Sequence, residues 1–471
     1  MKRKHRFHVV QGLVVCLGAA LIGCSSLSKQ DLKQESKQEG SEVSKSIINH
    51  QILPLTGPIQ VHRYTYKNGL KLLVIEDHSS PTFAYQTWYK VGSRDEDPGR
   101  TGLAHLFEHM MFKETKNLKD GEFERLLEQA GAEGNNAFTN RDFTAYVQEL
   151  PKDKLDLIAR LEAERAQNLI VNDEAFKTER EVVQNERRFR YENSPDGIMY
   201  QEIFGLAFKK HPYHWPVIGY QKDLDSMTSK DALNFYRKYY SPNHATVFVI
   251  GDVIADQVSE VVDRYYGHLK GIPEPSQDIA PEPLQKTPRI KKLPLNVQVQ
   301  KLLMGYHIPE VVHEDMPTLD VIQSILTSGN SSRLARALVN TGIATSVDSD
   351  NFEDKDPSLF LFGVNLQQKK TAIQAESVIL RELKRLGTEK VADEELKRAK
   401  NKLDFAFYQG LESNTQKAYF MGLYESVAGD FNMGMIQHER IRDVTAVDIQ
   451  RVAKKYFNPN SRTVIYGVQK K

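Results

Sequence analysis

Two histidines and a glutamate stand at helical spacing in the first third of the sequence. His105, Glu108 and His109 lie in an otherwise apolar run from Gly102 to Phe112, as in a buried helix. Residues four apart share one helix face, so both imidazoles point the same way. A catalytic zinc takes three protein ligands and leaves a position for water. The pattern predicts a zinc site with His105 and His109 as ligands, Glu108 as general base and a third ligand from elsewhere.

The motif at residues 105–109 leaves another interpretation open, in which two partly exposed helix histidines simply pair with a glutamate. The sequence has 14 histidines among 471 residues. A match by chance somewhere in the chain is therefore expected on the order of a few times in a hundred. The surrounding sequence has to decide between the two interpretations.

Strands and helices alternate along the chain around and beyond this motif, and the two halves of the sequence end alike. Met227 to Phe248 aligns without gaps with Val444 to Ile465. Each copy has a helical period, an aromatic pair, a Pro-Asn turn and an apolar strand. A repeat this long indicates two homologous domains of about 200 residues, each an antiparallel-rich mixed sheet packed with helices, in the α+β class.

The ends of these domains are marked by changes in composition. Prolines punctuate a polar stretch at 272–288, which we predict to be a linker. The domain predicted to hold the zinc site is 60–271, and the homologous domain after the linker is 289–471. The polar stretch 24–59 has little apolar periodicity and is predicted to be a tether.

The first residues are typical of an export signal. Basic residues precede an apolar stretch from Val9 to Ile22, which is shorter than the roughly 20 apolar residues of a membrane-spanning helix. The end of this stretch resembles a bacterial lipobox, which implies a signal peptide at 1–23 and lipidation of Cys24. By the same resemblance, Ser25 indicates an outer-membrane location facing the periplasm. An ordinary signal peptide with a chance cysteine is the alternative.

The composition sets few limits on partners. The sequence has 63 basic and 62 acidic residues, a net charge of +1. This balance gives no reason to expect a nucleic-acid partner. Cys16 and Cys24 are the two cysteines of the sequence, so the folded part needs no disulfides and its stability must come from burial.

The context of the histidine motif resembles the insulinase/pitrilysin zinc metallopeptidase family, in its bacterial processing-peptidase-like branch. The resemblance is carried by these segments around and beyond the motif: Gly92 to Glu96, Gly102, Met110 to Lys113, Asn136 to Asn140, Thr144 to Tyr146, Glu162 to Arg165, His211 to Tyr213 and Pro216 to Gly219. It covers most of the first domain and implies one Zn²⁺ per chain.

The resemblance also implies further site residues. Glu186, in the acidic run that begins at Thr178, takes the place of the family's third zinc ligand, and Glu179 would orient a histidine. Several neighbouring glutamates make an ordinary solvated helix face the alternative. The residues implied to bind substrate as an added strand are Asn136, Ala137, Phe138 and Thr139. An internal strand without that role is the alternative there.

The second half departs from the family pattern. A rough alignment by repeat puts Asp320, Gln323 and Ser324 at the places of His105, Glu108 and His109. Self-sufficient members of the family also carry an arginine and a tyrosine that help to bind substrate. Here Leu338 and Thr345 stand at those places. We therefore expect a homologous partner subunit without zinc that supplies this pair, with a homodimer as the alternative.

The function implied is a zinc metalloendopeptidase that hydrolyses peptides or unfolded polypeptide segments. Glu108 would take the proton of the attacking water. A non-catalytic scaffold or assembly subunit of the envelope is the rival hypothesis. A solute-binding lipoprotein would share the signal and the tether but has no use for the histidines and glutamates of the motif.

Overall fold

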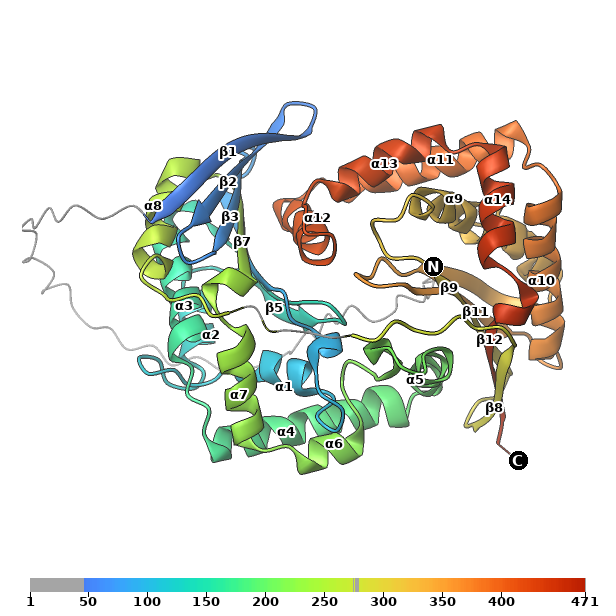
Figure 1. Cartoon of the computed structure of the whole chain (residues 1–471), viewed down its shortest axis with the longest axis horizontal. Helices are drawn as coiled ribbons and strands as arrows, with labels where there is room; N and C mark the ends of the chain where they lie inside the picture. Colours follow the sequence, from blue (N-terminus) through green and yellow to red (C-terminus); the bar gives the residue numbers. More distant parts are fainter. Residues whose placement is uncertain (1–45, 274, 276–278, 471) are drawn as a thin grey trace, which may run out of the picture.

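Two mixed β-sheets packed with helices form the framework of the protein (Figure 1). The computed structural model describes residues 46–273, 275 and 279–470. The seven-stranded sheet has the order β1-β2-β3-β7-β4-β6-β5, and the five-stranded sheet has the order β10-β11-β9-β12-β8. The predicted α+β class, with two related halves of mixed sheet and helix, is confirmed.

The elements have the following bounds. The strands are β1 Ile47–Thr56, β2 Ile59–Tyr66, β3 Lys71–Glu76, β4 Thr82–Tyr89, β5 Glu133–Thr139, β6 Thr144–Pro151, β7 Ala245–Gly251, β8 Arg289–Leu295, β9 Lys301–Ile308, β10 Ala344–Asn351, β11 Ser358–Leu366 and β12 Thr463–Gln469. The α-helices are α1 Leu103–Met110, α2 Glu122–Gln129, α3 Leu155–Asn168, α4 Asp173–Arg187, α5 Pro195–Ala207, α6 Gln221–Ser226, α7 Ser229–Tyr239, α8 Ala255–Tyr266, α9 Met316–Thr327, α10 Ala372–Thr388, α11 Asp393–Gln409, α12 Asn414–Val427, α13 Met433–Asp443 and α14 Ala446–Tyr456.

The two sheets repeat the same strand pairing. In the first sheet β3 pairs with β7 in parallel, and β7-β4-β6-β5 continue antiparallel. In the second sheet β8 pairs with β12 in parallel, and β12-β9-β11-β10 continue antiparallel. The repeated sequence also makes the same helix cap, because Thr228 and Thr445 each accept a hydrogen bond from the third residue of α7 or α14. The predicted duplication is confirmed.

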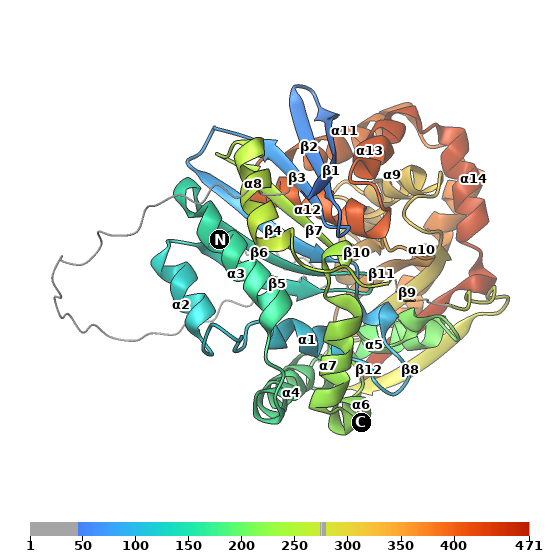
Figure 2. The ribbon, with the colours of Figure 1, turned by 60° about the vertical axis from the view of Figure 1, so that its left-hand side comes forward.

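Burial on both faces explains the apolar runs of the central strands. In β3, Leu72 and Val74 belong to one hydrophobic core, whereas Leu73 and Ile75 belong to another. Side chains alternate between the faces of a strand, so a continuous apolar run can fill both cores. Helices α3 and α8 cover one face of the first sheet, and α12 lies against β4 and β7 on the other (Figures 1 and 2).

One helix of each half packs against the sheet of the other half. From the second half, α12 contributes Ala418 and Met421 to the core that contains Trp88. Gly422 permits this approach, because a Cβ there would lie 2.2 Å from a ring atom of Trp88. From the first half, α5 packs Ile203 and neighbouring residues onto β11 and β12. The sequence division at the linker thus separates the sheets, but each sheet is completed by the other half.

The predicted boundaries need one correction. The polar tether was predicted to reach residue 59, but Ile47–Thr56 forms strand β1 and pairs with β2. β1 is an edge strand that exposes Ile48 and Ile52, so its weak apolar pattern hides it in the sequence. The described residues of the linker 272–288 contain no helix or strand.

The predicted signal peptide 1–23, Cys24 and the part of the predicted tether up to residue 45 lie outside the described residues. In the part of the chain that the structure describes, no helix is long and apolar enough to cross a membrane.

Candidate metal centre

Helix α1 carries the histidine motif and is held firmly at its start. The side chain of Glu96 accepts hydrogen bonds from the backbone N–H groups of Gly102 and Ala104, at 2.9 and 2.7 Å. Gly102 has a φ of 92°, and a Cβ there would lie 2.4 Å from the carbonyl oxygen of Ile218. Only glycine fits this conformation and this close contact without strain. The acidic residue and the glycine before the motif thus fix where α1 begins.

Three ligand atoms converge between α1 and α4. The Nε2 atoms of His105 and His109 lie 3.7 and 3.5 Å from Oε2 of Glu186. The ligand atoms of these three residues all lie within 4.8 Å of one another, and among the described residues no other group of histidines, cysteines and acidic residues does so.

This arrangement fits a zinc ion. Tetrahedral zinc binds imidazole nitrogen and carboxylate oxygen at about 2.0–2.2 Å, which places ligand atoms roughly 3.3–3.6 Å apart. Two histidines and one glutamate are a ligand set of catalytic zinc sites, and they leave a fourth position open. The structure therefore brings together His105, His109 and Glu186 as the sequence predicted, in a geometry that could hold the metal.

Further charged groups contact two of these three residues. Glu179 lies on the same face of α4 as Glu186. Its Oε2 lies 3.4 Å from Nδ1 of His109, and its Oε1 lies 2.8 Å from Nζ of Lys113. Arg190 contacts Oε1 of Glu186 at 2.9 Å. Sequence reasoning anticipated Glu179 but missed Arg190, which lies at the i+4 spacing from Glu186 that could have indicated it.

Burial and neighbouring charges set the protonation of the cluster. Burial lowers the pKa of His105 to about 3, and the charge of His109 adds to this shift. Burial also disfavours a charge on His109, but hydrogen bonds with Glu179 and Glu186 outweigh it and raise its pKa to about 10. For Glu186, burial is outweighed by His109, His105 and Arg190, and the pKa falls to about 2. Glu186 is therefore a carboxylate at neutral pH, ready to bind a cation.

Glu108 points to a different neighbour. Its Oε2 accepts a hydrogen bond from the hydroxyl of Thr139 on β5, at 2.6 Å. Burial raises the pKa of Glu108, against the opposing effects of His109 and Thr139. A raised pKa brings a carboxylate closer to the pH at which it can exchange protons efficiently. Glu108 is not one of the three convergent ligands.

Strand β5 contains the four residues predicted to bind substrate. Among the described strands it pairs with β6 alone and forms one edge of the first sheet, so the alternative of an internal strand is wrong. Ala137 is buried, whereas Asn136, Phe138 and Thr139 are half-buried. An edge strand presents backbone groups that can pair with an extended peptide.

The second half repeats the framework without the ligands. Asn351 of β10 takes the place of Thr139 of β5. Asn351 pairs with Phe360 of β11 and Thr139 pairs with Thr144 of β6, in each case as the last pair before the connection between the two strands. Asn351 donates to Asp320 at 2.7 Å, as Thr139 donates to Glu108. Asp320 thus corresponds to Glu108, and the rough sequence alignment was wrong by about one helical turn. Pro317 and Val321 then take the places of the two histidines.

The two positions that lack the expected arginine and tyrosine are also described. Leu338 is fully buried in the core of the second half, and Thr345 is exposed on β10. The hydroxyl of Thr345 donates to the backbone oxygen of Asn365 at 3.1 Å. Neither side chain could reproduce the charge of an arginine.

The half-buried side chain of Glu353, near Asp320 in the second half, yields a stability prediction. Burial raises the pKa of Glu353 to about 8, and the nearby Asp320 adds to the shift. The neutral form of Glu353 is therefore favoured in the folded protein. Its contribution to stability is fully present below about pH 4.5 and is lost as the pH rises through about 8. We expect Glu353→Gln to raise the unfolding temperature at about pH 9 by roughly 2–4 °C, the effect of about 1 kcal/mol. Thermal unfolding measured at about pH 5 and pH 9 checks this.

The prediction has an internal control. The hydroxyl of Tyr424 donates to Oε1 of Glu353 at 2.9 Å, and a glutamine oxygen can accept the same bond. The variant and the unaltered chain should therefore unfold at similar temperatures at about pH 5. A gain of equal size at both pH values would contradict an ionisation origin.

Comparisons with known proteins identify the family. The model described as "Insulinase (Peptidase family M16)" matches residues 71–219, and "Peptidase M16 inactive domain" matches residues 226–403. The chain is 34% identical over 413 residues to the zinc protease PqqE of Helicobacter pylori, covering 85% of this chain and 91% of that one. The chain belongs to the insulinase family, M16.

Other similarities in the M16 family agree. A probable mitochondrial-processing peptidase subunit beta of Arabidopsis thaliana is 25% identical over 405 residues, 83% of this chain and 75% of that one. The crystal structure of a protease from Helicobacter pylori superposes with a TM-score of 0.83 at 32% identity, covering 89% of this chain and 99% of that one. The match to the model that is described as inactive, residues 226–403, includes β8 to β11 of the second half, where the described residues hold no ligand cluster.

Proposed function

We propose that this M16 protein is a zinc-dependent endopeptidase that hydrolyses peptides or unfolded polypeptide segments. The observation that carries the proposal is the convergence of His105, His109 and Glu186, with the carboxylate of Glu108 left outside the ligand set. Two relatives carry the name zinc protease, PqqE of Helicobacter pylori and an uncharacterized zinc protease of Bacillus subtilis. One zinc ion is proposed per chain, since one such cluster occurs among the described residues.

Each residue of the site has a proposed role. His105, His109 and Glu186 hold the zinc, which when bound activates water and polarises the scissile carbonyl. Glu108 takes a proton from the attacking water and returns it to the leaving amine. An extended substrate adds to the open edge of β5, where backbone hydrogen bonds favour unfolded segments over folded proteins.

A chelation experiment tests this function. The purified chain is assayed for zinc and for cleavage of fluorogenic peptides and of an unfolded polypeptide. We expect cleavage that a chelator abolishes and that added zinc restores. Zinc-loaded protein that cleaves none of these substrates, alone or with a partner, would favour the rival scaffold function.

Glu179 is proposed to orient His109 through its carboxylate. Removing such a partner of a metal-binding histidine typically weakens metal binding 10- to 100-fold. We expect Glu179→Gln to weaken zinc binding by about this factor, because the glutamine loses the charge that faces His109 and Lys113. Competition with a chromogenic zinc chelator measures the affinity. Unchanged affinity would show that Glu179 serves only the fold.

We also propose that a homologous subunit without zinc completes substrate binding. The buried Leu338 and the exposed Thr345, at places where an arginine and a tyrosine are expected, support this. Activity of the isolated chain is compared with that of a mixture with such a homologue. Full activity of the isolated chain, as a monomer or homodimer, would refute the need for the partner.

Location is a separate proposal that rests on the sequence. Cleavage before Cys24 and lipidation of its thiol would anchor the protein to the bacterial envelope, at the outer membrane and facing the periplasm. Labelling with a radioactive fatty acid, followed by membrane fractionation, tests this. We expect label in the unaltered chain and none in Cys24→Ala. Equal labelling of both would contradict the proposal.

A further inference from the structure

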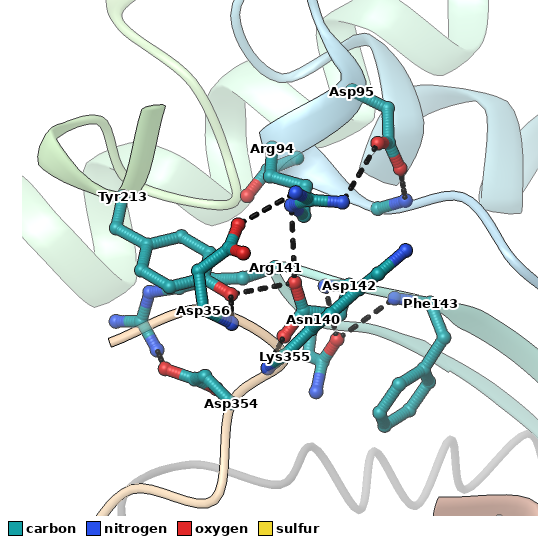
Figure 3. A network of polar contacts seen from close by, with 12 residues as sticks. Arg94, Asp95, Asn140, Arg141, Asp142, Phe143, Tyr213, Asp354, Lys355 and Asp356 are labelled. Atoms are coloured by element: carbon teal, nitrogen blue, oxygen red, sulfur yellow. Dashed lines mark hydrogen bonds and ion pairs between the residues drawn. The ribbon is translucent and has the colours of Figure 1, made fainter. Parts of the chain in front are cut away.

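A short segment of the second half enters the first half beside β5. It lies between β10 and β11 and contains Asp354 and Asp356 (Figure 3). Asp356 contacts Nη2 of Arg94 at 2.6 Å, and Asp354 contacts Nη1 of Arg141 at 3.4 Å. The backbone N–H of Lys355, between them, donates to Oδ2 of Asp142 at 3.0 Å. We name these contacts the turn junction.

The turn junction contacts the connection between β5 and β6. Arg141 and Asp142 belong to this connection, and both are buried. From the first half, the hydroxyl of Tyr213 donates to Oδ1 of Asp142 at 2.7 Å and the guanidinium of Arg94 lies 3.5 Å from the same oxygen. Buried charges are held in place when each has its partner, and removal of one partner leaves the other uncompensated.

The backbone of the same connection is fixed as well. Asn140 accepts hydrogen bonds at its side chain from the N–H groups of Asp142 and Phe143, at 2.7 and 3.0 Å. The N–H of Arg94 donates to the carbonyl oxygen of Arg141 at 2.9 Å. A Cβ at Gly92, two residues before Arg94, would lie 2.4 Å from this carbonyl group, so the two backbone segments can come this close only at a glycine.

Thr139, the last residue of β5, directly precedes this connection and contacts Glu108. Its hydroxyl lies 2.6 Å from Oε2 of Glu108 and 3.2 Å from the hydroxyl of Thr144. Thr144 in turn donates to the carbonyl oxygen of Val91 at 2.9 Å. A hydroxyl can donate to a carboxylate and accept from a carboxyl group. The Thr139 contact therefore suits Glu108 both before and after it takes a proton.

We propose that the second half positions the general base: Asp354 and Asp356 hold the β5–β6 connection in place, and Thr139 transmits this position to Glu108. This inference rests on the proposed peptidase function for its effect on rate. It makes Thr139 a positioning residue, in addition to its place in the strand predicted to bind substrate. It also gives the half that lacks metal ligands a direct part in the active site.

Substitutions at Thr139 test the last step. We expect Thr139→Val to lower kcat about 10- to 100-fold, because a small misplacement of a catalytic group has an effect of this order. Zinc content should stay the same and KM should change little. Thr139→Ser keeps the hydroxyl and should restore most of kcat. A valine variant with unaltered kcat, or a serine variant as slow as the valine variant, would overturn the role of the hydroxyl.

Hydrogen exchange tests the turn junction without relying on activity. In Asp354→Asn/Asp356→Asn, we expect faster exchange of backbone amides in residues 133–150 than in the unaltered chain. The matched control is Asp77→Asn, which removes another ion pair between the halves, to Lys417 at 2.6 Å, far along the chain from the turn. This control should leave exchange in 133–150 and kcat unchanged.

The outcomes separate the two proposals. Unchanged exchange at 133–150 in the double variant, with the fold verified by thermal unfolding, would overturn the inference whatever the activity. Faster exchange together with an unaltered chain that binds zinc but cleaves nothing, alone or with the homologous subunit, would uphold the turn junction and refute the peptidase function. Faster exchange over the whole chain would mean that the two aspartates serve general stability, which also overturns the inference.

Discussion

Glu108→Gln is expected to lower kcat by about 10²- to 10⁴-fold while the zinc content stays at one ion per chain. The amide has nearly the same shape as the carboxylate, and its oxygen can still accept the hydrogen bond from Thr139. It cannot take a proton from water. Initial rates of peptide cleavage, measured with metal analysis of the same sample, check the prediction.

The site gives this experiment a clear control. Glu108 does not belong to the group of ligand atoms formed by His105, His109 and Glu186. A loss of rate that comes with a loss of zinc would therefore contradict the assigned role, because it would make Glu108 part of the metal's binding site. Hydrolysis that survives the substitution would contradict it more directly.

Glu186→Gln is expected to weaken zinc binding by far more than the 10- to 100-fold typical of a residue that only orients a ligand. The carboxylate is the anionic member of the ligand set, and Arg190 would be left without the partner it contacts at 2.9 Å. A zinc affinity too weak to survive gel filtration is the expected result. Chelator competition and metal analysis provide the measurement.

A neighbouring glutamate serves as the matched control. Glu181 lies on the same helix, α4, and is exposed. Glu181→Gln should leave zinc affinity and peptide cleavage unchanged. If the two substitutions had equal effects, the acidic helix would act through its general charge, and the assignment of Glu186 would be wrong.

Much of the fold could be predicted from the sequence because its signals are local or repeated. The histidine spacing, the apolar strands and the gapless repeat at 227–248 and 444–465 reflect helix and strand periods directly. The edge strand β1 was missed because it exposes most of its side chains and carries little apolar pattern. Such a strand is defined by its pairing with β2, which the sequence of β1 alone does not encode.

The exchange of α5 and α12 between the halves could not be predicted from sequence. Each helix carries apolar residues that fit any core, and its pattern does not say which sheet it covers. The pairs Asp356 with Arg94 and Asp354 with Arg141 join residues that are 262 and 213 positions apart in the sequence. Charged residues at such separations carry no local signal.

The candidate site could be predicted only in part from the sequence, for the same reason. His105, Glu108 and His109 share one helix, whereas Glu186 required the likeness to a family and is placed by the packing of α4 on α1. The contact between Thr139 and Glu108 depends on the position of the β5 edge beside α1, which only the structure provides. The rough alignment of Asp320 failed because the two halves differ in the loops before α1 and α9.

X-ray diffraction at the zinc absorption edge tests the proposed metal centre itself. We expect one anomalous peak per chain, within about 2.0–2.2 Å of Nε2 of His105, Nε2 of His109 and a carboxylate oxygen of Glu186. Glu108 should stay outside the coordination sphere and keep its hydrogen bond with Thr139. A zinc-supplemented crystal with no peak at this cluster, or with the metal bound elsewhere, would show that these three residues are not the zinc ligands.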